Sequence, residues 1–266
     1  MIGVPVYIHG GTIIATGGGV ENFYGGAGIG GSFGCSNGTI TITGGNITAT
    51  GARSAAGIGS GPFNDCEADI TITGGNITAT GGSTQSGHGG AGIGAGLNTS
   101  GLAFTWHGDL EATVTIGGNA IVSASGGGIN NGTGRGGAGI GGGFGGNAGN
   151  GKVIIKDNAE VIAVGGDEAA GIGGGAEVGD YGGEGAEVSI TGNARVAALS
   201  GGYKTCAIGN GGGDSYKGPL TLGDNMKVQA GNNGSEYERT FTTAERVSAC
   251  QYRYAACVEP CDRVTT

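Results

Sequence analysis

The ten residues TITGGNITAT occur twice without a change, at residues 41–50 and again at residues 71–80. A shorter signature follows each copy: AAGIG ends at Gly59, and GAGIG ends at Gly94. Looser versions of the pair recur along most of the chain. A repeat with a period of tens of residues is typical of solenoids, in which each repeat is one unit that stacks on the next.

The glycine content favours a tightly turning solenoid. Of the 266 residues 69 are Gly, against a usual content of about 7%. A collagen triple helix needs glycine at every third position and much proline, whereas this chain has 4 Pro and no triplet period. Alternating apolar residues, such as Ile40 and Ile42 or Val114 and Ile116, argue against disorder. We expect glycine at corners, where φ is positive or backbones approach closely.

Three short strands are predicted in each repeat. Because side chains alternate across a strand, each strand places one recurring apolar residue inside. In the first strand these residues are Ile8, Ile42, Ile72, Ile116, Ile155, Ile190 and Leu222. In the second they are Ala15, Ala49, Ala79, Ala124, Ala163, Ala198 and Ala230. In the third, which a seventh repeat lacks, they are Ile29, Ile58, Ile93, Ile140, Ile172 and Ile208.

A polar column is predicted at the corner between the first and second strands. Its members are Thr12, Asn46, Asn76, Asn119, Asn158, Asn193 and Asn225, and the Asn spacings are 30, 43, 39, 35 and 32 residues. A constant signature at varying spacing indicates a fixed coil with insertions in its loops. Stacked Asn side chains can hydrogen-bond along the axis. We predict an all-β fold, a right-handed parallel β-helix of about seven three-strand coils.

The repeat stops after Gly231, where the composition changes. We predict two parts, the β-helix over residues 1–231 and a Cys-rich C-terminal cap over residues 232–266 that covers the open end of the solenoid. The start, MIGVPVYIHGG, lacks the basic and apolar segments of a signal peptide and runs directly into repeat-like sequence. We expect the chain to be part of a longer, multidomain protein.

Charge and hydropathy exclude two classes of partner. The formal net charge is −9, and no basic stripe is present, so we expect no nucleic-acid binding. No apolar run reaches the roughly 18 residues of a membrane span, so we expect no membrane insertion.

The six cysteines favour an oxidising compartment, because no pair has zinc-site spacing. Cys35 and Cys66 both follow the third strand, in adjacent coils. Stacked coils lie about 4.8 Å apart and a disulfide joins Cα atoms about 4.4–6.8 Å apart, so we predict a Cys35–Cys66 bridge. A second bridge is predicted within the cap among Cys250, Cys257 and Cys261, and the odd member of that trio then lies near Cys206.

Four acidic residues stand in matching positions of neighbouring coils, and two arrangements are predicted for them, one of which is a cation site. Asp65 aligns with Asp109, and Glu67 aligns with Glu111, on neighbouring coils. Like charges about 5 Å apart repel by about 3 kcal/mol at an effective dielectric constant of 20. Either the loops splay into water, or a Ca²⁺ ion bridges the carboxylates with loop carbonyl oxygens.

The TITGGNITAT…GAGIGGG register, with the tail ERVSACQYRYAACVEPC, resembles glycine-rich β-helix modules of large surface proteins from anaerobic gut-type bacteria. The resemblance covers residues 6–261. Such modules are described as carbohydrate-binding or adhesin-like, so the resemblance implies an extracellular or cell-surface location and partners among glycans or host and bacterial surface components. It implies no catalytic residue.

The leading functional prediction is a non-enzymatic spacer or adhesin module whose loops bind carbohydrate. Trp106 stands beside Phe104 and His107 in the longest loop, and Tyr181 stands far out on another; these residues could stack on sugar rings. A second row, Phe33, Phe63, Leu97 and Phe144, follows the third strand and is predicted to form an internal stack or loop staple.

The alternative is a β-helix polysaccharide lyase or glycoside hydrolase. SGHGG at residues 86–90 resembles the GHG of β-helix polygalacturonases, but the chain has no Asp-Asp pair. No acidic triplet stands in register beside Arg53, Arg135 or Arg195, as a Ca²⁺-assisted lyase would need. We therefore expect His88 to be a loop residue, the protein not to be an enzyme, and no cofactor other than the Ca²⁺ of the second alternative above.

Overall fold

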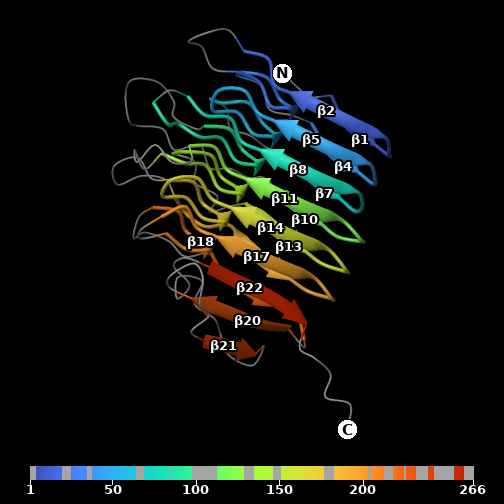
Figure 1. Cartoon of the computed structure of the whole chain (residues 1–266), viewed down its shortest axis with the longest axis vertical. Helices are drawn as coiled ribbons and strands as arrows, with labels where there is room; N and C mark the ends of the chain where they lie inside the picture. Colours follow the sequence, from blue (N-terminus) through green and yellow to red (C-terminus); the bar gives the residue numbers. More distant parts are fainter. Residues whose placement is uncertain are drawn as a thin grey trace.

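The chain forms a parallel β-helix. The computed structural model describes residues 4–19, 25–34, 38–63, 69–84, 86–97, 113–128, 135–145, 151–176, 183–202, 205–212, 218–224, 226–231, 239–242 and 255–260. Six complete coils stack from the N-terminal to the C-terminal end, each with one strand in each of three sheets, and a seventh coil begins with β19. Figure 1 shows the stack from the side, with the corners between the first and second sheets along its right-hand edge.

The strands of each sheet lie in the order of the coils. The first sheet contains β1 (Val6–Ile8), β4 (Ile40–Ile42), β7 (Ile70–Ile72), β10 (Thr113–Ile116), β13 (Lys152–Ile155), β16 (Glu187–Ile190) and β19 (Leu220–Leu222). The second contains β2 (Thr12–Thr16), β5 (Asn46–Thr50), β8 (Asn76–Thr80), β11 (Ile121–Ser125), β14 (Glu160–Val164) and β17 (Arg195–Leu199), followed by β22 (Ala255–Pro260), β20 (Met226–Gly231) and β21 (Arg239–Thr242). The third contains β3 (Ile29–Gly30), β6 (Ile58–Gly59), β9 (Ile93–Gly94), β12 (Ile140–Gly141), β15 (Ile172–Gly173) and β18 (Ile208–Gly209).

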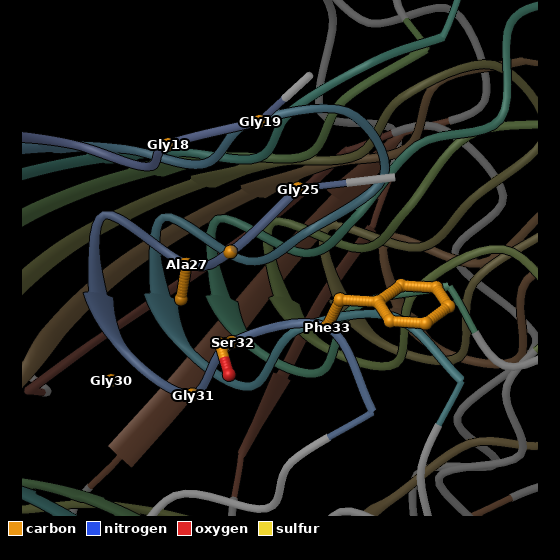
Figure 2. A pocket seen from close by; sticks show the side chains of 9 residues that line it. Gly18, Gly19, Gly25, Ala27, Gly30, Gly31, Ser32 and Phe33 are labelled. Atoms are coloured by element: carbon orange, nitrogen blue, oxygen red, sulfur yellow. The ribbon is translucent and has the colours of Figure 1, made fainter. Parts of the chain in front are cut away.

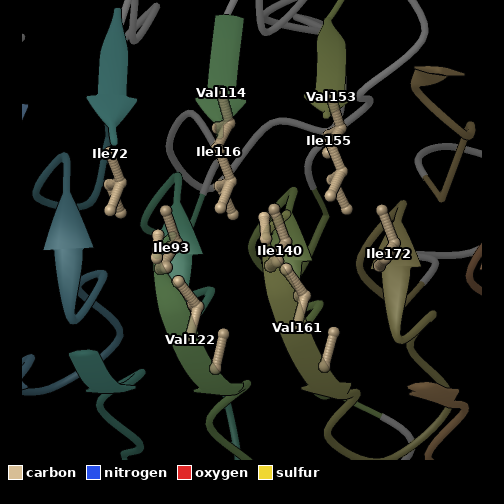
Figure 3. Packing of buried hydrophobic residues seen from close by; sticks show 14 of the residues in the cluster. Ile72, Ile93, Val114, Ile116, Val122, Ile140, Val153, Ile155, Val161 and Ile172 are labelled. Carbon is tan, nitrogen blue, oxygen red and sulfur yellow. The ribbon is translucent and has the colours of Figure 1, made fainter. Parts of the chain in front are cut away.

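The core is a thin column of aliphatic side chains shared by all coils. In the first sheet Ile8, Ile42, Ile72, Ile116, Ile155, Ile190 and Leu222 stand in register, as predicted. The Ala column of the second sheet, from Ala15 to Ala198, and the Ile column of the third sheet are confirmed in the same way. Figure 3 shows how the inward Ile and Val side chains of successive coils line up. No coil could bury such a core alone, so the stack is the stable unit.

Glycine is required after each Ile of the third sheet. The six glycines at this position, Gly30, Gly59, Gly94, Gly141, Gly173 and Gly209, have φ between 128° and 136°. A Cβ atom at Gly59 would overlap the carbonyl oxygen of Gly94 in the next coil. Both the backbone conformation and the close stacking therefore exclude other residues, which explains the invariant end of the AGIG signature.

The corner between the first and second sheets has two forms. In coils 1–3 the first inward-facing residue of the second strand comes five positions after the buried Ile of the first strand, as from Ile42 to Ile47. In coils 4–6 the step is six positions, as from Ile116 to Val122. The additional residue is a fully buried alanine: Ala120, Ala159 or Ala194.

The predicted Asn column is therefore interrupted. Asn76 donates from Nδ2 to Oδ1 of Asn46 (3.0 Å). A separate ladder joins Asn119, Asn158 and Asn193 over 3.1 Å each. Between coils 3 and 4 the expectation of one continuous column is wrong, because Asn76 lies opposite Ile121 and not opposite Asn119. Asn225 lies outside the described residues.

At the C-terminal end a strand from the tail enters the second sheet. The repeat predicts Ala230 directly after Ala198, but β22 lies between β17 and β20 and pairs antiparallel with both. Ala256 therefore stands opposite Ala198, and Val258 is buried against the core. Figure 1 shows β22, β20 and β21 below the last coil. The sheet thus joins residues from both predicted parts, 1–231 and 232–266.

Candidate functional site

All eight residues predicted to bind a ligand or a cation lie outside the described part of the chain. These are Phe104, Trp106, His107 and Tyr181 of the carbohydrate prediction and Asp65, Glu67, Asp109 and Glu111 of the Ca²⁺ prediction. Both sets stay predictions. Within the described ranges, no group of three or more His, Cys, Asp and Glu side chains could hold a metal ion.

Of the six cysteines, Cys206 is the one whose side chain lies within the described part of the structure. It is buried in coil 6 and is disulfide-bonded. Cys35, Cys66, Cys250 and Cys261 lie outside the described residues, and of Cys257 only the backbone, in β22, is described. The predicted pairings therefore stay predictions.

The loops on either side of the third sheet contain many glycines and form the glycine-rich loop edge of the molecule. At this edge His88 lies in a cluster with Arg135 and Phe144. His88 lies in the loop of coil 3 between β8 and β9, as predicted. Its backbone N–H donates to Oγ1 of Thr84 (3.0 Å), and its carbonyl oxygen accepts from Ser54 Oγ of the preceding coil (2.9 Å). The backbone of His88, in a loop that is half glycine, is thus fixed by hydrogen bonds to side chains of two coils.

The His88 ring contacts two side chains of coil 4. It stacks on Phe144, with ring centroids 4.9 Å apart and planes inclined by 14°. Nη1 of Arg135 lies 3.1 Å from His88 Nε2. A guanidinium has only donors, so Nε2 accepts and Nδ1 carries the proton. Nδ1 is buried and has no hydrogen-bond partner within the described part of the chain.

The environment keeps His88 neutral. Burial lowers the pKa of His88 from its usual value of 6.5, and the positive charge of Arg135 lowers this pKa further. The lone pair of Nε2 is already engaged and Nδ1 is covered, so the ring is poorly placed to take a proton from a substrate. What the cluster does is join coil 3 to coil 4 and hold the Arg135 guanidinium at the loop edge.

The predicted row of apolar side chains after the third strand is confirmed as an internal stack over most of its length. Leu97, Phe144 and Ala176 form a buried cluster, and Phe63 packs against it. The ring of Phe33 lies 5.7 Å from that of Phe63 but remains 54% exposed. Phe33 is therefore the coil-1 end of the described row, and about half of its side chain is exposed.

A shallow hollow of about 590 Å³ lies beside Phe33. It is lined by Gly18, Gly19, Gly25, Gly26, Ala27, Gly30, Gly31, Ser32 and Phe33. In Figure 2 the loop segment with Gly18 and Gly19 lies on one side, Gly30 and Gly31 lie on the other, and the ring of Phe33 extends past Ser32. The N–H groups of Gly25, Gly26, Ala27 and Gly31 already donate to backbone carbonyl oxygens. The hollow thus offers the exposed backbone at Gly18, Gly19 and Gly30, one hydroxyl group and one aromatic ring.

Comparison with known proteins identifies the repeat. A family model described as a β-helix repeat matches residues 6–33, 40–62, 70–97 and 153–176. Each match begins on a strand of the first sheet and ends just after the third, so each covers one coil. No curated protein and no solved structure matches the chain. In the part of the chain that is described, no helix is long and apolar enough to cross a membrane.

Proposed function

We propose that this β-helix repeat protein is a non-enzymatic extracellular or cell-surface module, a rigid spacer or adhesin segment that binds carbohydrate at its glycine-rich loop edge. The continuous core supports the spacer role, because a stack held by hydrogen bonds and shared apolar columns bends little between coils. The resemblance to surface modules and the six cysteines support the location.

The hollow beside Phe33 is the observation that carries the carbohydrate proposal. An exposed aromatic ring covers the apolar face of a pyranose, while neighbouring donors and acceptors bind its hydroxyl groups. Phe33 supplies the ring, Ser32 a hydroxyl group, and the exposed glycines Gly18, Gly19 and Gly30 leave their backbone without side chains in the way. The aromatic residues Phe104, Trp106 and Tyr181 would extend such a site along other loops.

The enzyme alternative has less support. A polysaccharide lyase or glycoside hydrolase needs carboxylates that converge with a base in one groove. The cluster that the described loops form contains an arginine and a histidine whose proton-accepting nitrogen is already engaged by that arginine. A Ca²⁺ ion at Asp65, Glu67, Asp109 and Glu111 would stabilise loops in this proposal and carry out no chemistry.

The experiment is binding of the purified chain to an array of polysaccharides and oligosaccharides, followed by titration calorimetry on each positive ligand. Phe33→Ala should weaken binding by about tenfold, the loss of one aromatic stacking contact. Tyr7→Ala is the matched control, because Tyr7 is an exposed aromatic residue of the same coil on a different sheet. Wild-type protein that binds no glycan, or equal losses in both variants, would overturn the proposal. New reducing ends or unsaturated products would instead favour the enzyme.

A further inference from the structure

Among the described strands, the second sheet has an edge without a neighbour at each end. At the C-terminal end β17 is covered by β22, and the sheet continues through β20 to β21. At the N-terminal end β2 is the last strand, and no described segment pairs with its outer side. Core residues are correspondingly more exposed in coil 1 than further along: Ile8 is 9% and Ile29 is 8% exposed, against 0% for Ile58.

No described backbone group bonds to the outer side of β2, which is a hydrogen-bonding edge. Asn46 N donates to Gly11 O and Gly17 N donates to Thr50 O, both over 2.8 Å. In a parallel ladder alternate residues bond to the same neighbour, so the backbone groups of Thr12, Ile14 and Thr16 point away from coil 2. The strand has five residues, no proline and no charged residue, which makes it a template for another strand.

The margin at the other end has the same property. Ala198 and Ala256 face each other across β17 and β22, so Cys257 bonds toward β20, where its partner is Gln229. Val228 then bonds toward β21, where Phe241 stands opposite. By this alternation the backbone groups of Thr240 and Thr242 point out of the sheet.

The strand directions at the two margins are complementary. Each of β22, β20 and β21 runs antiparallel to its predecessor, so β21 runs opposite to β17 and therefore opposite to β2. Two copies with the same orientation along one axis would bring β21 of the first against β2 of the second in antiparallel pairing. The sheet already accepts an antiparallel strand at its end, because β22 covers β17 in this way.

We propose that copies of this chain associate end to end, with β2 of one copy pairing antiparallel to β21 of the next. The pairing continues the second sheet from molecule to molecule. The contact is heterologous and does not close on itself, so it produces open filaments whose length grows with concentration. This inference is independent of the carbohydrate proposal.

The test uses proline, which removes one backbone donor from each margin. Ile14→Pro removes an N–H group for which the described part of the chain shows no acceptor, and an edge strand tolerates proline there. Thr240→Pro does the same on β21. Ile14→Ala is the control, because it keeps the N–H group and removes only the exposed apolar side chain. Circular dichroism spectra and melting curves of all variants establish that they fold.

Sedimentation velocity on the 266-residue chain, from micromolar to sub-millimolar concentration, gives the outcome. Wild type and Ile14→Ala should form species of increasing mass. Each proline variant alone should be a monomer, but an equimolar mixture of the two should form a dimer, because each retains the margin that the other lacks. Monomeric wild type, continued association of Ile14→Pro, or a mixture that stays monomeric would each overturn the proposal. If one proline variant does not fold, adding the folded one to wild type must shorten the filaments.

Discussion

Coils 1–3 and coils 4–6 carry the same core columns but turn the same corner differently. In the first group the corner contains a glycine with φ between 92° and 110°, namely Gly11, Gly45 or Gly75. The second adds a buried alanine and uses a left-handed residue of φ between 59° and 73°, namely Gly118, Asp157 or Gly192. A solenoid can therefore keep its register in the strands while the corner changes length, because the ladders and the core fix the strands and the corner only joins them.

The corner changes form between coils 3 and 4, and the contacts between side chains change at the same junction. Between coils 3 and 4 the Asn side chains make no ladder hydrogen bond, since Asn76 stands opposite Ile121. At the opposite edge of the same two coils His88 joins Arg135 and Phe144. Side chains thus connect these coils at the loop edge and not at the corner.

The additional alanine gives the largest predicted effect. Ala159 is fully buried in the corner of coil 5, so Ala159→Asp would bury a charge without a partner and should lower the free energy of unfolding by several kcal/mol. Ile162→Asp places the same carboxylate on the outer face of the same coil, where Ile162 is 52% exposed, and should cost far less. Urea unfolding measures both. Similar losses would mean that the corner alanine does not belong to the core.

The two Asn ladders predict a smaller, graded effect. Asn158 makes side-chain hydrogen bonds to Asn119 and Asn193, whereas Asn76 makes one to Asn46. Because a neutral hydrogen bond contributes about 0.5–1.5 kcal/mol and these are exposed, Asn158→Ala should cost about 1 kcal/mol and Asn76→Ala about half of that. Urea midpoints of the two variants at constant slope are the measurement. A larger loss for Asn76→Ala would contradict the interrupted ladder.

Much of the fold could be predicted because a strand repeat determines its own register. Ile42 and Ile72 occupy identical ten-residue segments, so their stacking follows from the sequence. The corner could not be predicted in the same way. An alignment of the repeats on their Asn residues places Asn119 beside Asn76. In the structure the buried side chains of Ile77 and Val122 stand in register instead. The burial of apolar side chains therefore determines the register, even where it separates two Asn residues that match in the sequence.

The end of the sheet and the candidate site depend on contacts that no repeat specifies. Ala230 fits the Ala column by spacing, yet a tail strand with Ala256 and Val258 takes the place beside β17. The GHG segment could be recognised as a loop, but its partner Arg135 stands 47 residues away in another loop of variable length. The hollow at Phe33 is lined by segments on both sides of β3 that come together only in the fold, which local sequence does not indicate.

The junction between coils 3 and 4 should also carry the smallest effect, a pH dependence. The pKa of His88 is lowered in the folded chain, so the unfolded chain binds a proton that the folded chain does not. As the pH falls through about 6.5, the ordinary value, wild type should lose stability, and the loss should stop growing once the pH reaches the folded pKa. His88→Gln removes this titration while keeping a polar side chain. The difference in unfolding free energy between wild type and variant should therefore narrow from about pH 7.5 to about pH 5.5. The effect should be smaller than either Asn effect, because one partly exposed group titrates. A difference that stays constant over this range would mean that His88 is not held neutral between Arg135 and Phe144.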